Sequence, residues 1–254
     1  MALSVSNASL SLGGKTLLDD VSIQFELGCF SMILGPNGTG KSTLLKVING
    51  ELAKSTSVTF YQQERASWSL PELARSVAVL PQSSSLSFNF TVQEVVELGG
   101  LGLSATRQQL TEIAQHNMAR TGVAHLAGRA YPSLSGGEQQ RVHLARVLTQ
   151  IAQSPQAPIL MLDEPTSALD IAHQHHTLSL LQQLAQEGAG VVAVVHDLNL
   201  ASQYADRLVL LNGGKIVADG QPQEVLKPEI IEAVYQYPVN VMPHPELNFP
   251  MVIA

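Results

Sequence analysis

The glycine-rich segment 35–43 constrains the fold of this chain more than any other stretch. It fits the pattern G-x-x-x-x-G-K-[ST], whose glycines let successive backbone N–H groups point at one anion. The apolar run Phe30 to Leu34 predicts a buried strand before it, and Lys41 to Asn49 predicts a helix after it. The N-terminus of that helix adds about half a positive charge. The predicted nucleotide-binding residues are Gly35, Pro36, Asn37, Gly38, Thr39, Gly40, Lys41, Ser42 and Thr43.

Two side chains of this loop have predicted roles of their own. Lys41 is placed to reach the β- and γ-phosphates of a nucleotide, and the Ser42 hydroxyl is placed to bind Mg²⁺. The sequence thus predicts a nucleoside triphosphate and Mg²⁺ as the bound groups.

The composition limits the class of protein. The 254 residues are 45% hydrophobic and only 14% charged, which suits a globular chain whose thinly charged surface leaves room for a permanent partner. The net charge of −7 argues against sequence-independent nucleic-acid binding, which depends on Lys and Arg. Cys29 is the only cysteine, so an internal disulfide and a cysteine-based metal site are excluded.

No segment is expected to direct this chain into or across a membrane. The start, Met1 to Ser4, lacks the basic and apolar regions of a signal peptide. No apolar run approaches the roughly 18 residues that a spanning helix needs. We expect any membrane segment to come from another chain.

The first part of the chain is predicted to be rich in strands. Strands are expected at 3–12, 17–25, 58–62 and 77–80, with a turn at Gly13-Gly14 and a short helix at 71–75. From 83 to 152 no strand pattern occurs, and helices are expected at 91–98, where Thr91 and Glu94 form a capping box, and over 104–122. Region 83–152 is therefore predicted to be a helical subdomain.

Strand patterns return after residue 152. The apolar runs 159–162, 191–195 and 207–211 are separated by helical stretches, which is typical of a parallel sheet with crossover helices. Gly213-Gly214 predicts a final hairpin, and the proline-rich tail 237–254 is expected to be irregular. The predicted fold class is α/β, with a mixed, largely parallel sheet, an N-terminal antiparallel β-subdomain and an inserted helical subdomain. Residues 1–82 and 153–236 would form the catalytic core.

Two carboxylates follow the apolar strand 159–162. Asp163 and Glu164 are expected at the carboxyl end of a buried parallel strand, where ligands bind. We expect this strand beside the strand that leads into the glycine loop, so that Asp163 holds Mg²⁺ through water. Glu164 could then act as the general base for an attacking water. The alternative is that both acids merely begin a helix.

The string Leu134-Ser135-Gly136-Gly137-Glu138-Gln139-Gln140-Arg141 resembles the signature of ATP-binding-cassette ATPases. The resemblance covers essentially the whole chain, because the other motifs occur in the family's order. It implies that Gln82 is the glutamine of the Q-loop and a Mg²⁺ contact, that Ser167 and Asp170 belong to the D-loop, and that His196 is the switch histidine. It also implies the P-loop nucleoside-triphosphatase fold.

The signature is expected to act across a dimer. Ser135 and the two glycines precede a helix predicted from about Glu138 to Thr149, which makes a second phosphate-binding helix terminus. The resemblance implies a head-to-tail homodimer with two-fold symmetry. Each ATP would lie between one copy's P-loop and the other copy's signature, formed by Leu134, Ser135, Gly136, Gly137, Glu138 and Gln139.

Histidines and the adenine site leave alternatives open. His196 follows the strand 191–195, where an imidazole could bond the γ-phosphate. His173, His175 and His176 could suggest a metal site, but a solvated face or a dimer contact is preferred. The family usually stacks adenine on an aromatic residue where this chain has Leu12, so we expect weak discrimination between bases, unless Leu12 simply packs in the core.

The resemblance is closest to cassettes of importers for iron chelates, vitamin B12 and haem. Asp163 to Asp170, His173 and the tail His244-Pro245-Glu246 most resemble the ATP-binding subunits of hemin importers. This implies two copies of a polytopic permease, an indirect periplasmic substrate-binding protein, and a peripheral place on the cytoplasmic face of the bacterial inner membrane. The segment 83–102, with Phe88 and Phe90 as surface aromatics, would meet the permease.

Two alternatives of other classes remain open. One is a soluble cassette of iron–sulfur cluster assembly that has no permease. The other is a DNA-repair or ribosome-acting cassette, which fits less well because this acidic chain carries neither a long coiled-coil insertion nor a second cassette.

Overall fold

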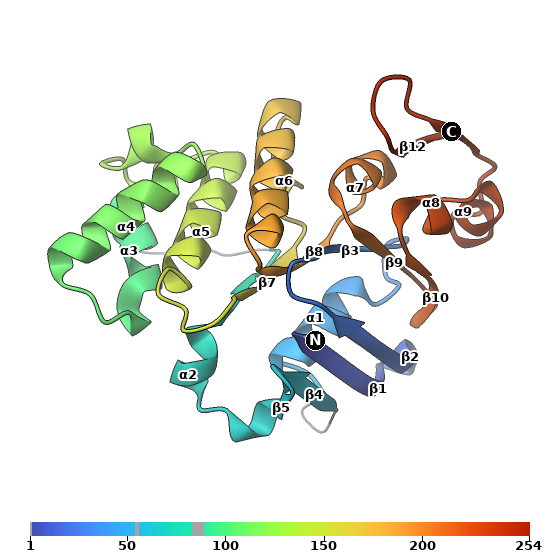
Figure 1. Cartoon of the computed structure of the whole chain (residues 1–254), viewed down its shortest axis with the longest axis horizontal. Coiled ribbons are helices and arrows are strands. Elements are labelled where there is room, and N and C mark those ends of the chain that lie inside the picture. The colour runs from blue at the N-terminus through green and yellow to red at the C-terminus, as the bar shows by residue number, and fades with distance from the viewer. Residues whose placement is uncertain (1, 54–55, 83–88) are drawn as a thin grey trace.

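A six-stranded sheet forms the centre of the fold, with helices on one face and a second sheet and a helix on the other (Figure 1). The computed structural model describes residues 2–53, 56–82 and 89–254. The strand order of the central sheet is β10-β9-β3-β8-β7-β6. The parallel strands are β3 (Phe30–Leu34), β6 (Val77–Leu80), β7 (Ile159–Asp163), β8 (Gly190–Val194) and β9 (Arg207–Asn212), and β10 (Lys215–Gly220) is antiparallel to β9.

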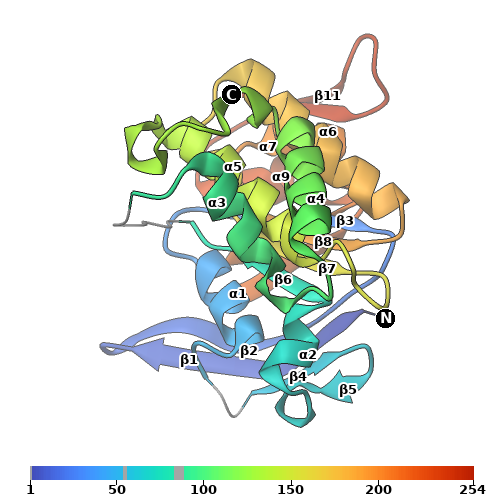
Figure 2. The ribbon, with the colours of Figure 1, turned by 90° about the vertical axis from the view of Figure 1, so that its left-hand side faces the viewer.

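The two faces of this sheet are covered by different partners. Phe30, Met32 and Leu34 point to one face, where they share a hydrophobic core with residues of α5 (Gly136–Gln150), α6 (Ile171–Gln186) and α9 (Pro228–Tyr235). Ile33 points to the other face, which is covered by α1 (Lys41–Asn49) and the antiparallel sheet (Figure 2). Because both faces are covered, all residues of β3, β7 and β8 are buried, as parallel strands require. The predicted strand, loop and helix around the P-loop are confirmed.

The antiparallel sheet is built from the N-terminal part of the chain. Its order is β2-β1-β4-β5, with strands β1 (Leu3–Leu12), β2 (Lys15–Phe25), β4 (Ser57–Phe60) and β5 (Gln63–Glu64). Gly13 and Gly14 form the β1–β2 turn with φ of 58° and 77°, as predicted. The strand predicted over 58–62 ends at Phe60, because Tyr61 and Gln62 take positive φ and turn the chain into β5. The 3₁₀ turn η1 (Arg65–Ser67) and helix α2 (Leu70–Ala74) follow.

The helical part of the chain has a hydrophobic cluster of its own. It comprises α3 (Val92–Glu97), η2 (Leu98–Gly102), α4 (Arg107–Arg120), η3 (Ala124–Leu126), η4 (Tyr131–Ser133) and α5. Val95, Met118 and Val142 belong to its core. Thr91 and Glu94 form the predicted capping box. In the described ranges no helix combines the length and apolarity that crossing a bilayer would need. The subdomain boundaries at 83 and 152 stay a prediction.

The two aromatic residues expected at the surface of this part have different outcomes. Phe90 is half-buried and packs against the helical cluster, so it lies only partly at the surface. Phe88 lies outside the described residues.

The C-terminal tail is a β-hairpin, which corrects the expectation of an irregular segment. β11 (Asn240–Pro243) pairs with β12 (Pro250–Ile253), and the two prolines face each other at the end of the ladder next to the loop. Proline lacks an N–H but is tolerated at the end of an edge strand, so its frequency here misled the prediction. The hairpin packs on α7 (Leu198–Tyr204): the Asn199 amide donates to the Val252 carbonyl at 3.0 Å and accepts from the Val252 N–H at 2.8 Å.

We predict that Asn199→Ala loosens the hairpin without unfolding the core. Both hydrogen bonds to Val252 are lost, which should make hairpin docking less favourable by about 1–2 kcal/mol. Hydrogen exchange should show faster exchange over 240–253, with unchanged protection in β3 and β8. Gln186→Ala, an exposed amide on α6, is the control. Equal exchange in the two variants would contradict the prediction.

Candidate nucleotide site

Two glycines of the P-loop, which joins β3 to α1, have no room for a side chain. Gly35 and Gly40 have φ of 143° and 104°, a region that L side chains rarely adopt. A Cβ on Gly35 would also meet the carbonyl oxygen of Leu211, and one on Gly40 would meet that of Leu17. The loop is therefore held tightly against β9 and β2. Gly40 is the N-cap of α1 and makes no side-chain cap, so the first N–H groups of this helix face the loop.

Lys41 lies at the start of α1 and is buried. Its Nζ donates to the Gly35 carbonyl at 2.7 Å and to the Pro36 carbonyl at 2.9 Å. Burial lowers the pKa of Lys41, while the Glu164 and Asp163 carboxylates act in the opposite direction. The cation is thus placed inside a loop whose backbone is suited to anions.

The Asp163 side chain meets Ser42 although β7 does not occupy the expected position in the sheet. β7 lies beside β8 and β6, and β8 separates it from β3, so the prediction that β7 adjoins the P-loop strand is wrong. The side chains still meet because α1 crosses over this face of the sheet: the Ser42 hydroxyl donates to Asp163 Oδ1 at 2.9 Å. Burial is the main cause that raises the pKa of the Asp163 carboxyl. A hydroxyl and a carboxylate are hard oxygen ligands of the kind that Mg²⁺ prefers.

Glu164 and His196 form a direct pair. His196 Nε2 lies 2.6 Å from Glu164 Oε1. The His196 side chain is 42% exposed, and the Glu164 side chain is 15% exposed. Glu164 follows β7, and His196 lies just past β8, the neighbouring strand. Since parallel strands end at the same edge of a sheet, the pair lies beside the P-loop.

Gln82 lies at the same edge. It follows β6, the neighbour of β7, by two residues, and it is exposed. The carboxyl ends of β6, β7, β8 and β3 therefore bring together Gln82, Asp163, Glu164, His196 and the P-loop. This is the arrangement in which ligands bind to open parallel sheets.

The signature segment begins helix α5 two residues earlier than predicted. α5 starts at Gly136 instead of about Glu138, because Ser135 is its N-cap. Ser135 and Glu138 form a capping box, in which the Ser135 N–H donates to Glu138 Oε2 at 2.7 Å. Leu134 is buried, whereas Ser135 and Gly136 are exposed.

The D-loop lies directly against the start of α5. A Cβ on Gly137 would lie 2.7 Å from the Ala168 carbonyl oxygen, so only glycine permits this approach. Asp170 is the N-cap of α6, and its Oδ1 accepts from the His173 N–H at 2.9 Å. The Ser167 hydroxyl donates to the Glu164 carbonyl at 3.2 Å.

Gln140 belongs to the signature string but was not among the residues predicted to form the site. Its Nε2 donates to the Glu164 carbonyl at 2.6 Å, and its Oε1 accepts from the Ala168 N–H at 3.3 Å. The available signal was helical spacing: Gln140 follows Gly136 and Gly137 by four and three residues, and residues at this spacing share one face of a helix.

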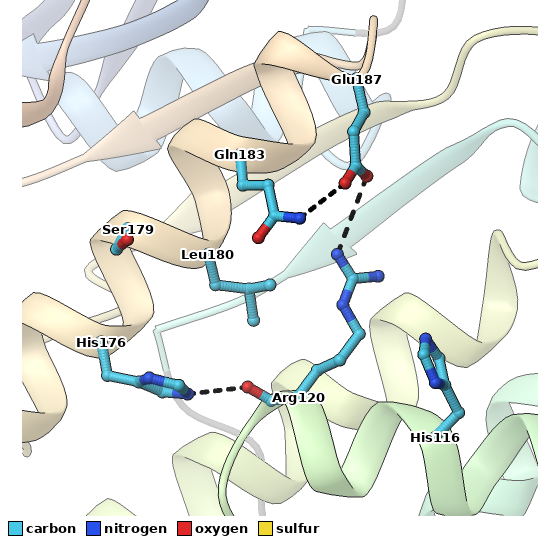
Figure 3. Close-up of a pocket in the computed structure, with 7 residues that line it drawn as sticks. All are labelled: His116, Arg120, His176, Ser179, Leu180, Gln183 and Glu187. Atoms are coloured by element: carbon cyan, nitrogen blue, oxygen red, sulfur yellow. Dashed lines mark hydrogen bonds and ion pairs between the residues drawn. The ribbon is translucent and has the colours of Figure 1, made fainter.

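Two of the three histidines of α6, His175 and His176, make structural contacts through their side chains. Figure 3 shows His176 at the groove between α4 and α6, where its Nε2 donates to the Arg120 carbonyl at 2.8 Å. Beside it Arg120 lies 3.9 Å from Glu187. His175 Nδ1 lies 2.8 Å from the Tyr204 hydroxyl. Among the described residues no group of three or more His, Cys, Asp or Glu is arranged for a metal, so nothing supports the metal interpretation.

Known proteins resemble this chain over its full length. The sequence model of the ABC transporter family matches residues 18–167. The hemin import ATP-binding protein HmuV of Photobacterium damsela subsp. piscicida is 54% identical, covering 100% of this chain and 96% of the relative. The HmuV protein of Aliivibrio fischeri is 53% identical (100% and 98% covered), and that of Vibrio cholerae is 51% identical (99% and 98% covered).

Solved structures show the same fold. One is the inward-facing conformation of a transporter assigned to the metal-chelate type of ABC transporters, with a TM-score of 0.81 and 28% identity over 99% of this chain and 96% of that one. Another is the dimeric structure of a bacterial ABC transporter cassette, with a TM-score of 0.76 and 26% identity over 86% of this chain and 98% of that one.

Proposed function

The chain belongs to the ABC transporter family, and from this premise we propose that it is the ATP-hydrolysing subunit of a hemin importer. The observation that carries the hydrolysis is the convergence of the P-loop, the Ser42–Asp163 pair and the Glu164–His196 pair at one edge of the sheet. The identity of 51–54% with hemin import ATP-binding proteins, over 99–100% of this chain, supports hemin as the transported substrate.

The P-loop binds the triphosphate. Its backbone N–H groups and the N-terminus of α1 face the phosphates, and Lys41 exchanges its bonds to the Gly35 and Pro36 carbonyls for bonds to the β- and γ-phosphates. Ser42, Asp163 and Gln82 would hold Mg²⁺, which neutralises charge on the phosphates when bound. The fit rests on the oxygen donors of Ser42 and Asp163, which already lie 2.9 Å apart.

Glu164 supplies the base. Its carboxylate accepts a proton from the attacking water. His196 is hydrogen-bonded to the same carboxylate, so it orients the Glu164 side chain, and it also contacts the γ-phosphate. General-base catalysis of this kind contributes roughly 10²–10⁴-fold to a rate. The remaining acceleration comes from positioning and from the cationic and N–H groups around the phosphates.

The site is completed by a second copy of the chain. We place the exposed Ser135 and the N-terminus of α5, with residues 134–139, against the ATP held by the partner copy's P-loop, with Ser167 and Asp170 at the contact between copies. The dimeric structure of a similar cassette supports this arrangement. ATP binding would then close the dimer and hydrolysis would reopen it.

The membrane partner completes the importer. Two copies of a polytopic permease would receive the movement, at segment 83–102, on the cytoplasmic face of the inner membrane. A periplasmic hemin-binding protein would act on the other side and would not touch this chain.

Reconstitution tests the substrate. In vesicles that hold this chain with a co-expressed hemin-type permease, hemin-loaded binding protein should raise ATP hydrolysis several-fold over the same protein without hemin. Binding proteins loaded with vitamin B12 or a ferric siderophore are the controls. A response to one of these and none to hemin would contradict hemin import, and full activity without the permease would favour the soluble-assembly alternative.

Ser135→Arg tests the shared site. The isolated subunit should bind a fluorescent ATP analogue with unchanged affinity, because its own P-loop is intact, but should hydrolyse ATP at least about 100-fold more slowly, the loss expected when stabilisation of transition-state charge is removed. Ser133→Arg adds the same charge two residues earlier and is the control. Normal turnover by Ser135→Arg would refute the two-copy site.

Leu12 tests base recognition. It is 50% exposed, so it is free to cover a base and is not part of the β-core. The affinities for GTP and ATP should differ by no more than about tenfold. One aliphatic side chain stabilises a bound base by less than the roughly 1–3 kcal/mol that aromatic stacking contributes. Leu12→Tyr should tighten the binding of both nucleotides, and Leu101→Ala, at another exposed leucine, should change neither. A strong ATP preference that survives Leu12→Ala would contradict this account.

A further inference from the structure

We propose that Gln140 is a positioning residue that ties the signature helix to the backbone of Glu164, and that it thereby couples the two ATP sites of the dimer. The proposal rests on the function proposed above and deepens it, because it names a device through which one site senses the other.

Glu164 has a backbone conformation that requires support. Its φ is 53°, in the left-handed region, where the Cβ of an L residue is crowded by its own backbone. Such conformations persist at functional sites only when the surrounding structure determines them. The direction of the Glu164 side chain toward His196 therefore depends on what holds this one peptide.

Three donors converge on the carbonyl oxygen of Glu164. The Ser167 N–H and hydroxyl lie at 3.3 and 3.2 Å, and Gln140 Nε2 lies at 2.6 Å. The Glu164 N–H in turn donates to Val194 in β8 at 3.1 Å. The Ser167 bonds come from the same turn of chain, so Gln140 is the donor that anchors this carbonyl to another element.

Gln140 also holds the D-loop. Its Oε1 accepts from the Ala168 N–H at 3.3 Å, so one half-buried amide spans the peptides at 164 and 168. Gly137, on the same face of α5, lets the helix approach Ala168. The start of α5 and segment 164–168 thus form one packed unit.

This unit has a consequence in a head-to-tail dimer. The N-terminus of α5 would contact the ATP on the partner's P-loop, whereas Glu164 acts on the ATP of its own chain. A shift of α5 at one nucleotide therefore moves the Glu164 carbonyl, and with it the base, at the other nucleotide. Gln140 is the side chain that transmits this shift.

The test compares Gln140→Ala and Gln140→Glu with Gln150→Ala in the reconstituted importer. Gln150 is a matched control, because it lies at the far end of α5 and its amide also donates to backbone carbonyls, those of Ala74 and Val77. We measure nucleotide affinity, kcat, KM, the Hill coefficient for ATP and Tm. Gln140→Glu keeps the size of the side chain and replaces the donor with a carboxylate that faces the Glu164 carbonyl.

The expected pattern separates positioning from general packing. Both Gln140 variants should bind ATP normally. Their kcat should fall about tenfold, which corresponds to the free energy of about one hydrogen bond. Their Hill coefficient for ATP should fall to about 1. Gln150→Ala should lower Tm as much as Gln140→Ala while keeping kcat and the Hill coefficient. Unchanged kcat in Gln140→Ala, or equal kcat losses in both alanine variants, would overturn the proposal.

The wild-type measurement separates this failure from failure of the proposed function. A wild-type protein that hydrolyses ATP as a monomer without cooperativity would overturn the shared site and the coupling together. A cooperative wild-type dimer whose Gln140 variants stay cooperative would overturn the coupling alone.

Discussion

Parallel pairing in the central sheet determines where chemistry can occur in this protein. β3, β8, β7 and β6 end at one edge, and the polar residues of the candidate site lie at those ends or shortly after them. Apart from Ser31 in β3 and Asp163 at the end of β7, these strands are apolar, because helices and the antiparallel sheet bury both of their faces. Charge is therefore excluded from the interior of the sheet and gathers at its edge, where Lys41, Asp163 and Glu164 come into mutual range.

Local sequence patterns predicted most of the fold but not the order of its strands. The P-loop, its flanking strand and helix, and the capping box at Thr91 depend on neighbouring residues alone, and the structure confirms them. That β8 separates β3 from β7 depends on contacts between distant segments, which no local pattern records. The C-terminal hairpin was missed for a related reason: its prolines lie where the ladder ends, so they do not interrupt it.

The candidate site shows the same division. Motif residues at strand ends were predicted from their position after apolar runs, and the structure brings Ser42 to Asp163 and His196 to Glu164. Gln140 was not assigned, because its importance lies in a bond to a backbone carbonyl. A backbone carbonyl has no sequence signature. The left-handed conformation of Glu164, which this hydrogen bond helps to hold, is visible only in three dimensions.

The docking of the C-terminal hairpin on α7 has a practical consequence. β12 lies on the helix that begins just after His196, and Asn199 and Ser202 fasten it there through Val252 and Pro250. An affinity handle or fluorescent protein joined after Ala254 would lie next to this attachment, because β12 ends at Ile253. An untagged preparation is therefore the reference against which the turnover of such a fusion should be compared.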